Sequence, residues 1–432
     1  MKKYLPLVSV SCFVLMVFGL LVVYGCGQVS KAPEEGFSSE GAYILVGNNI
    51  KTSGVNTGGT ISGKVIQSFT GTAIPGALIF APSATSGIVS TETNSSGNYT
   101  LSGAQIGKIP VTVAKQNYIA ITVVCNSSTV NFALYSTLEA PSIPGVGTIE
   151  ADIRYGGATI MDGHVWGYSE NEPMVSHGTL TLQDLDLPAG TVHLSAHAVG
   201  LGGTSQVTTL NLSEGETKLV TLEISPLVGT VEGIITPPSG LPDLHISANR
   251  FYPGCHILEF GGASIEGTTY AIQVSPSQGD PYLLFLQATT QEAGGWTIPI
   301  SLIYDPLSIS DGQTISSRDY TLEDLPTLIY PSGSISTGTP TFEWSPSGSP
   351  NVYFVITGQV YAKWWGFTDE TSIQYPNFPA GSEWEIPSTQ QSWNTYAVYK
   401  SGLDLSNIDL VDLMEGGCKV SRARANTFTK TP

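Results

Sequence analysis

Two histidines have a spacing that could suit a metal ion. His193 and His197 are four positions apart, so on a strand both side chains would lie on one face, and imidazole nitrogen is a common zinc ligand. No third ligand lies near them in the sequence. The HExxH pattern, the Gly-x-Ser-x-Gly elbow and the Walker loop do not occur. We therefore predict no metal ion, no cofactor and no catalytic residue, in a protein that is not an enzyme.

Acidic side chains are densest at two places that could bind calcium. Carboxylate oxygens are ligands that Ca²⁺ prefers, but neither place has the spacing of an EF-hand loop. We favour solvated charge at both places, which comprise Asp184, Asp186, Asp404, Asp409, Asp412 and Glu415.

Tryptophans gather in the last quarter of the chain and could bind a ligand. Five of the seven follow Pro326: Trp344, Trp364, Trp365, Trp384 and Trp393. Indole rings can stack on the flat C–H faces of sugars. Trp364 and Trp365 are adjacent, so on a strand they point to opposite faces and one of them is expected to be exposed. We predict a ligand-binding platform of Trp364, Trp365, Trp384 and Trp393. The alternative is that these rings form the core of the last module.

Residues 1–26 have the layout of an export signal. Lys2 and Lys3 precede an apolar run from Tyr4 to Tyr24. The segment Val23–Cys26 then resembles the lipobox of bacterial lipoproteins, in which the cysteine becomes acylated. The resemblance implies that Cys26 is lipidated and anchors the protein to the cell envelope, at the outer membrane or the cell surface. The alternative is an uncleaved transmembrane anchor, because the run is nearly long enough to span a bilayer.

The composition favours turn-rich β structure and argues against nucleic acid as a partner. The chain of 432 residues has 48 Gly and 27 Pro, only 12% charged residues and a net charge of −18. Binding to nucleic acid requires Lys and Arg side chains that displace counterions. A chain of this length also exceeds one ordinary domain.

The stretch Gly59–Leu134 has the pattern of one small β-sandwich. Ile61 and Val65 alternate with polar neighbours, Pro75-Gly76 predicts a turn, and Asn94–Asn98 predicts a hairpin tip. About seven short strands, at a spacing of roughly 8–12 residues, are typical of a sandwich.

The order of these features resembles the carboxypeptidase regulatory-like family, which has a transthyretin-like sandwich fold. The segments that carry the resemblance are Gly63–Val65, Pro75–Ala77, Ser96–Tyr99 and Val130–Leu134. They are framework positions, so the resemblance implies a fold and carries over no catalytic residue.

The start of this module recurs twice along the chain. The segment Gly59–Gly63 (GTISG) is followed by Gly147–Ala151 (GTIEA) and by Gly229–Gly233 (GTVEG). The part that follows Pro326 is similar to fibronectin type III-like modules, which implies a core position for Trp344. We predict an all-β chain of tandem antiparallel β-sandwiches, transthyretin-like or immunoglobulin-like. The predicted parts are a signal peptide at 1–26, a flexible tether at 27–58, sandwiches at 59–138, 145–226 and 227–325, and a fibronectin type III-like domain at 326–432.

Three cysteines follow the signal, and each falls in a different predicted module. Cys125, Cys255 and Cys418 therefore cannot form a disulfide within a module, and we expect buried free thiols.

Together these features predict a non-catalytic lipoprotein displayed at the cell surface. The tether and the array would hold the last domain away from the membrane, where it would contact a cell-surface glycan or protein. The alternatives are a structural envelope or spacer protein, and an accessory subunit of a polysaccharide-processing system.

Overall fold

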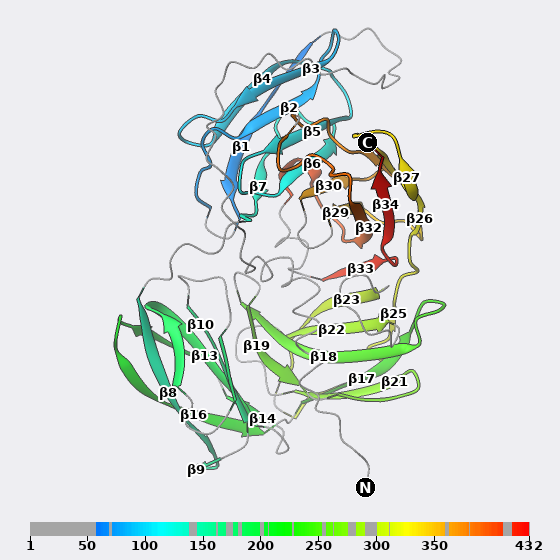
Figure 1. The fold of residues 1–432 in the computed structure, drawn as a ribbon. Helices are drawn as coiled ribbons and strands as arrows, with labels where there is room; N and C mark the ends of the chain where they lie inside the picture. The colour runs from blue at the N-terminus through cyan, green and yellow to red at the C-terminus, as the bar shows by residue number, and fades with distance from the viewer. Residues whose placement is uncertain are drawn as a thin grey trace.

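The computed structural model describes most of the chain after the predicted tether. The described residues are 58–68, 71–137, 145–160, 163–169, 176–179, 184–198, 203–205, 207–226, 229–252, 256–261, 263–274, 282–289, 300–310, 312–358, 363–379, 381–408 and 417–431. Strands dominate these ranges, which confirms the predicted all-β class (Figure 1). The predicted signal, Cys26 and the tether up to residue 57 lie outside them.

Among the described residues, no helix has the length and apolar character that crossing a bilayer requires.

The first module is a sandwich of two sheets, formed by strands β1 to β7. One layer has the order β4-β1-β7, and the other contains β3-β2-β5-β6. Ile61 and Val65 point into the core while Lys64 is exposed, as the alternating pattern predicts. The bounds are β1 Gly59–Gln67, β2 Leu78–Pro82, β3 Ile88–Glu92, β4 Asn98–Ala104, β5 Ile109–Ala114, β6 Ala120–Cys125 and β7 Phe132–Leu134.

The second module, β8 to β16, repeats this pairing. Strand β8 lies antiparallel to β12 and parallel to β16, as β1 lies antiparallel to β4 and parallel to β7. Strand β14 pairs with both β13 and β16 and so links the two layers. The bounds are β8 Val146–Tyr155, β9 Ala158–Thr159, β10 Gly163–Ser169, β11 Ser176–Thr179, β12 Asp184–Pro188, β13 Gly190–Ala198, β14 Gly203–Ser205, β15 Thr208–Leu212 and β16 Thr217–Pro226.

The third module, β17 to β25, again has a first strand with one antiparallel neighbour and parallel pairing on its other side. Strand β17 lies antiparallel to β21 and parallel to β24 and β25, and the order β19-β18-β22-β23 matches β3-β2-β5-β6. The bounds are β17 Gly229–Thr236, β18 Asp243–Tyr252, β19 His256–Gly261, β20 Ala263–Glu266, β21 Thr269–Val274, β22 Tyr282–Thr289, β23 Ile300–Leu307, β24 Thr314–Ile315 and β25 Tyr320–Thr321. The three modules that begin with related segments therefore have the same pairing around their first strand.

The last module also has two layers, but with a different strand order. Strands β26, β28 and β31 form a three-stranded sheet, which packs against a layer ordered β30-β29-β32-β33. The resemblance to fibronectin type III modules stays a prediction. The bounds are β26 Thr327–Tyr330, β27 Gly333–Ile335, β28 Thr341–Ser345, β29 Val352–Thr357, β30 Trp364–Thr368, β31 Ser372–Gln374, β32 Gln390–Tyr399, the 3₁₀ turn η2 Leu405–Asn407, β33 Cys418–Arg422 and β34 Asn426–Lys430.

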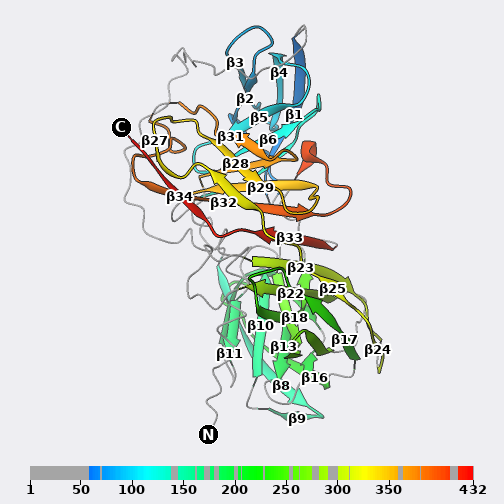
Figure 2. The same ribbon diagram turned by 90° about the vertical axis from the view of Figure 1, so that its right-hand side faces the viewer.

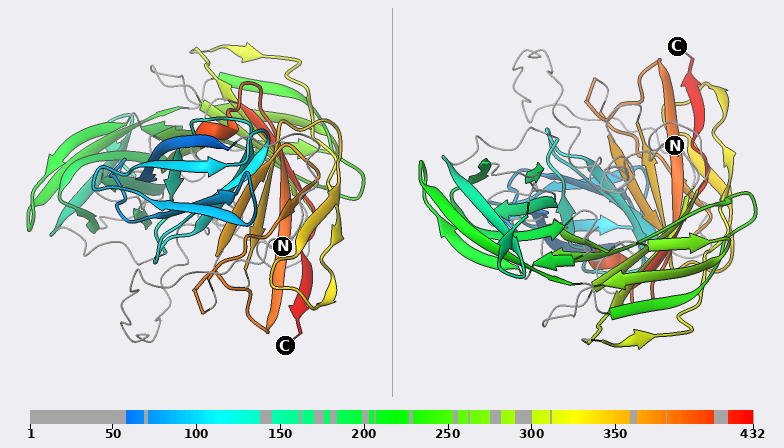
Figure 3. Two further views of the ribbon diagram at one scale, coloured as in Figure 1. Left: turned by 90° about the horizontal axis from the view of Figure 1, so that it is seen from above. Right: turned by 90° about the horizontal axis from the view of Figure 1, so that it is seen from below.

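One continuous sheet joins three of the four modules. Strand β30 pairs in parallel with β6 of the first module, and β33 pairs antiparallel with β23 of the third module. The last module therefore lies between the first and the third (Figures 1 and 2). The second module projects to one side of this assembly (Figure 3). The predicted linear array, with the last domain at its far end, is wrong, because strand pairing brings the last module back between earlier ones.

A glycine–tyrosine contact fixes the first strand in two of the repeats. Tyr99 Oη donates to the carbonyl of Val130 at 2.7 Å, and Tyr270 Oη donates to that of Arg318 at 2.7 Å. Each tyrosine lies opposite a glycine of the first strand, Gly63 or Gly233. A Cβ atom at Gly63 would lie 1.8 Å from the Val130 carbonyl oxygen, so only glycine fits there.

We predict that Gly63→Ala destabilises the first module. The added methyl must displace the Val130 backbone, and such overpacking costs about 1–3 kcal/mol. The measurement is the unfolding midpoint in denaturant, with Gly338→Ala as a matched control. A Cβ at Gly338 would lie 3.7 Å from the flexible end of Lys430. Equal midpoints for the two variants would contradict the steric account.

Candidate functional site

The junction between the first and the last modules brings together the residues that the sequence singles out. It consists of β6 and β30, paired in parallel with Trp364 opposite Ala120 and Phe367 opposite Val123, together with the side chains that cover them. We call this region the module junction. The strand carrying Trp364 and Trp365 is thus an inner strand with a neighbour on each side, β29 and β6.

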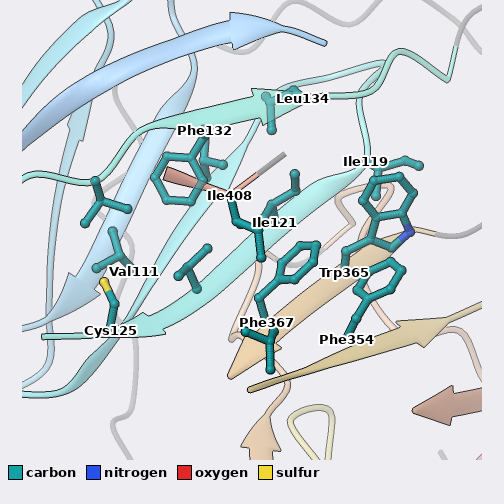
Figure 4. Close-up of a cluster of buried hydrophobic side chains, with 14 of the residues drawn as sticks. Val111, Ile119, Ile121, Cys125, Phe132, Leu134, Phe354, Trp365, Phe367 and Ile408 are labelled. Atoms are coloured by element: carbon teal, nitrogen blue, oxygen red, sulfur yellow. The ribbon is translucent and has the colours of Figure 1, made fainter. Parts of the chain in front are cut away.

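Trp365 lies on the face of the sheet that belongs to the core of the first module. Its ring packs against Tyr135 with 4.7 Å between centroids, and edge-on against Phe354 at 5.4 Å (Figure 4). Ile121 is its partner on β6. The ring therefore fills a core that residues of both modules share.

Trp364 lies on the opposite face, where it makes a specific polar contact to the first module. Its Nε1–H donates to Oγ1 of Thr122 at 2.8 Å, and that hydroxyl lies 2.9 Å from the hydroxyl of Thr112. The ring lies over Gly366, where a Cβ would come within 2.6 Å of the indole. Glycine at position 366 thus leaves space for the indole that reaches Thr122.

The two remaining tryptophans of the predicted platform also donate hydrogen bonds within the protein. Trp384 Nε1–H donates to the Tyr118 carbonyl of the first module at 3.1 Å. Trp393 Nε1–H donates to the Pro331 carbonyl at 2.8 Å, within the last module. Both indoles therefore satisfy their only donor against protein backbone.

The predicted ligand-binding platform is wrong. Trp364 and Trp365 are 0% exposed, and Trp384 and Trp393 are 8% and 1% exposed. Trp364 and Trp365 do point to opposite faces, as the period of two requires, but both faces of the sheet are covered. The alternative, that these rings form the core, is what the structure has. That core also extends into the first module.

Polar contacts surround the module junction. The Lys108 ammonium pairs with Asp369 at 2.5 Å and with Glu370. The Asn117 amide donates to Oε1 of Glu383 at 2.8 Å, and the Asn131 amide donates to the carbonyl of Ser406 at 2.8 Å. Such exposed contacts contribute little energy each.

The junction between the last and the third modules has a similar construction. Leu302 of β23 lies opposite Val420 of β33, which in turn lies opposite Val398 of β32, so an apolar row crosses the boundary. Beside it, Lys419 Nζ lies 2.8 Å from Oε1 of Glu323. The last module is therefore held on both sides by backbone pairing and packed side chains.

The metal-ligand candidates whose side chains the structure describes each bond to a different neighbour. His193 Nδ1 lies 2.9 Å from the Thr209 hydroxyl, and the side chain of His197 lies outside the described residues. Asp186 accepts a hydrogen bond from the Thr148 hydroxyl at 2.8 Å, and Asp404 caps η2 through the Ser406 amide at 2.9 Å. Within the described ranges, no three His, Cys, Asp or Glu side chains are grouped to hold a metal ion.

The remaining acidic candidates cannot be placed. Asp409, Asp412 and Glu415 lie outside the described residues, as does the side chain of Asp184.

Two of the three predicted free thiols are buried and unreactive in character. Cys125 and Cys418 are both free and buried. Burial raises the pKa of the Cys125 thiol to about 11 and that of Cys418 to about 12, so the reactive thiolate is scarce at neutral pH. Cys255 lies outside the described residues.

Comparison with protein families identifies the first module. Residues 60–135 match the carboxypeptidase regulatory-like domain, which agrees with the resemblance of the framework segments. This match covers the first module and no other. Comparison with curated proteins finds no match.

Comparison with solved structures finds several proteins at low similarity. The Bacillus anthracis TIE protein is 12% identical with a TM-score of 0.17, over 61% of this chain and 50% of that protein. GBS52, the minor pilin of Streptococcus agalactiae, is 12% identical with a TM-score of 0.16, over 38% of this chain and 94% of the pilin. A putative adhesin from Bacteroides ovatus is 10% identical with a TM-score of 0.16, over 41% of this chain and 95% of the adhesin. The chain covers only half of the TIE protein.

Sequence reasoning missed Thr122, which accepts the hydrogen bond from Trp364, and Thr112, which lies beside it. Thr112 and Thr122 interrupt the apolar strands β5 (IPVTVA) and β6 (AITVVC), and both are almost fully buried. A buried hydroxyl requires a hydrogen-bond partner, so two threonines in otherwise apolar strands were the available signal.

We predict that Thr122→Val weakens the module junction. Valine keeps the shape of threonine but leaves the buried Trp364 N–H without an acceptor, which costs about 1–3 kcal/mol. The measurement is denaturant unfolding followed by tryptophan fluorescence. The control is Thr100→Val, because Thr100 is exposed on β4. The account fails if both variants unfold at the same denaturant concentration.

Proposed function

We propose that this protein is a non-catalytic, lipid-anchored scaffold of the bacterial cell surface. Its β-sandwich modules form one connected body rather than a chain of independent domains. In this proposal the last module is a structural link between the first and the third, and protein partners bind on the outside of the assembly. Because the tryptophans are buried, the proposal gives them no role in binding sugars.

The observation that carries the proposal is the continuous sheet. Hydrogen-bonded strands run from β3 through β6, β30 and β33 to β19, across three modules. A swivelling linker would allow modules to move separately, whereas backbone pairing at two boundaries resists such motion. Side-chain contacts support the same role, because Trp364, Trp384 and Lys108 each bond across the boundary between the first and the last modules.

The anchor in this proposal is Cys26, which follows the apolar run of the export signal. Acyl chains contribute about 0.8 kcal/mol for each buried CH₂ group, so a multiply acylated cysteine holds a protein stably on a membrane.

We predict that Cys26→Ser releases the protein from the membrane fraction. The serine variant lacks the thiol that would be acylated, so the chain should appear in the soluble extracytoplasmic fraction. The measurement is cell fractionation, with surface labelling of intact cells to locate the wild-type chain. Cys125→Ser is the matched control, because that thiol is buried in the first module. Continued membrane association of the Cys26 variant would sink the lipid anchor and favour a transmembrane anchor.

We predict that the first and third modules keep a fixed separation in solution. Spin labels at Thr100→Cys and Thr269→Cys, both exposed positions, should give one narrow distance distribution by electron spin resonance. A background with Cys12→Ser, Cys26→Ser and Cys255→Ser removes the thiols whose surroundings are not described. The control pair lies within the first module, at Thr60→Cys and Thr100→Cys. A distribution several times broader between modules than within one would refute the connected scaffold.

A further inference from the structure

The long sheet ends at two outer strands that differ in how they are covered. At one end, β19 contacts β10, β13 and β14 of the second module. At the other end, β3 pairs with β2 and lies beside β4 of the other layer of the same module, but no second strand among the described residues is hydrogen-bonded to it. Strand β3 lies at the outer end of the first module (Figures 1 and 2).

The hydrogen bonds of the β2–β3 hairpin show which groups of β3 face outward. Ser83 N–H donates to the Gly87 carbonyl at 2.9 Å, and Thr93 N–H donates to the Ala77 carbonyl at 3.0 Å. In an antiparallel pair such bonding residues alternate, so Val89 and Thr91 also direct their amides toward β2. The N–H and C=O groups of Ile88, Ser90 and Glu92 therefore point to the open edge.

This edge lacks several of the features that usually prevent strand pairing, and its one charged residue, Glu92, lies at the end of the strand. Strand β3 has the sequence IVSTE, with no proline, glycine or lysine, and its register with β2 is regular. Two other outer strands do carry such features. On β15, the Lys218 ammonium caps the Asn211 carbonyl at 2.7 Å, and β26 has a bulge between Leu328 and Tyr330.

We propose that β3 pairs with β3 of a second copy of this chain, antiparallel and with Ser90 on a two-fold axis. The outward groups of Ile88, Ser90 and Glu92 then meet Glu92, Ser90 and Ile88 of the other copy. Such a self-complementary contact closes as a dimer, because each copy uses the same surface. It continues the long sheet from one copy into the next.

The side chains favour this register over one with Glu92 on the axis. With Ser90 on the axis, Val89 of each copy lies opposite Thr91 of the other, and β-branched cross-strand pairs stabilise a sheet. Each Glu92 lies opposite an isoleucine, at opposite ends of the contact. An axis at Glu92 would instead place two carboxylates face to face, which is destabilising.

The same chain already extends this sheet by lateral strand addition. Strand β30 adds to β6 across a module boundary, and β33 adds to β23. Pairing at β3 continues this mode of assembly between molecules, in the way that extended segments add to an exposed sheet edge. Because each copy carries a net charge of −18, salt should strengthen the contact by screening the repulsion between copies.

The decisive experiment is disulfide cross-linking of Ser90→Cys in the full chain carrying Cys26→Ser. Residues that exchange both hydrogen bonds across an antiparallel pair have Cα atoms about 5.5 Å apart, which suits a disulfide. We expect a covalent dimer to form about tenfold faster than with Thr100→Cys, an exposed control on β4 of the same module. The chain without an introduced cysteine gives the background from native thiols.

Analytical ultracentrifugation of the chain with its native β3 provides an independent measure. We expect a monomer–dimer equilibrium that shifts toward dimer at higher salt, and its loss in Ser90→Pro. Proline removes an outward N–H and leaves the β2 ladder intact, so the unfolding midpoint should be retained. A monomer at all concentrations, equal cross-linking rates for the two cysteine variants, or dimers that persist in Ser90→Pro would each overturn the proposal.

Discussion

The parallel pairing of β6 with β30 is the contact on which the rest of the structure depends. It places the last module against the first, so that a strand of one sandwich becomes an inner strand of a larger sheet. Both faces of that sheet are then covered, one by the core of the first module and the other by β28 and its neighbours. A strand buried on both faces can carry consecutive large apolar side chains, which explains the sequence WWGFT in β30.

The three repeats share their main strand pairings but differ at one outer strand of the second layer, which is β6 in the first module, β23 in the third and β15 in the second. In the first module β6 receives β30, and in the third module β23 receives β33. In the second module the corresponding strand is β15, whose Asn211 carbonyl is capped by Lys218. The repeats thus keep their internal framework while their edges determine what each can join. This difference explains why only two of them are built into the long sheet.

The local alternation of apolar and polar residues predicted the sandwiches. The burial of the tryptophans depends on pairing between strands that are far apart in the chain, which the sequence did not reveal. Alternation correctly placed Ile61 and Val65 inside and Lys64 outside, and parity correctly separated Trp364 from Trp365. Exposure was mispredicted because it depends on which strand lies beside β30, and that neighbour is far away in the chain. The apolar run of β29, VYFVIT, is the kind of signal that marks a strand covered on both faces, since all six of its residues are buried. No sequence pattern indicated that β30 pairs with β6.

The distance along the chain between the paired strands has a consequence for how the protein folds. Thr122 and Trp364 are 242 positions apart, and the second and third modules lie between them in the sequence. Closing so large a loop costs entropy before the contact forms, and contacts of this kind slow folding. The first module is synthesised early, yet β6 must wait for nearly the whole chain to follow. During that interval the edge of β6 lacks its partner strand, so correct assembly depends on the order and timing of chain synthesis as well as on final stability.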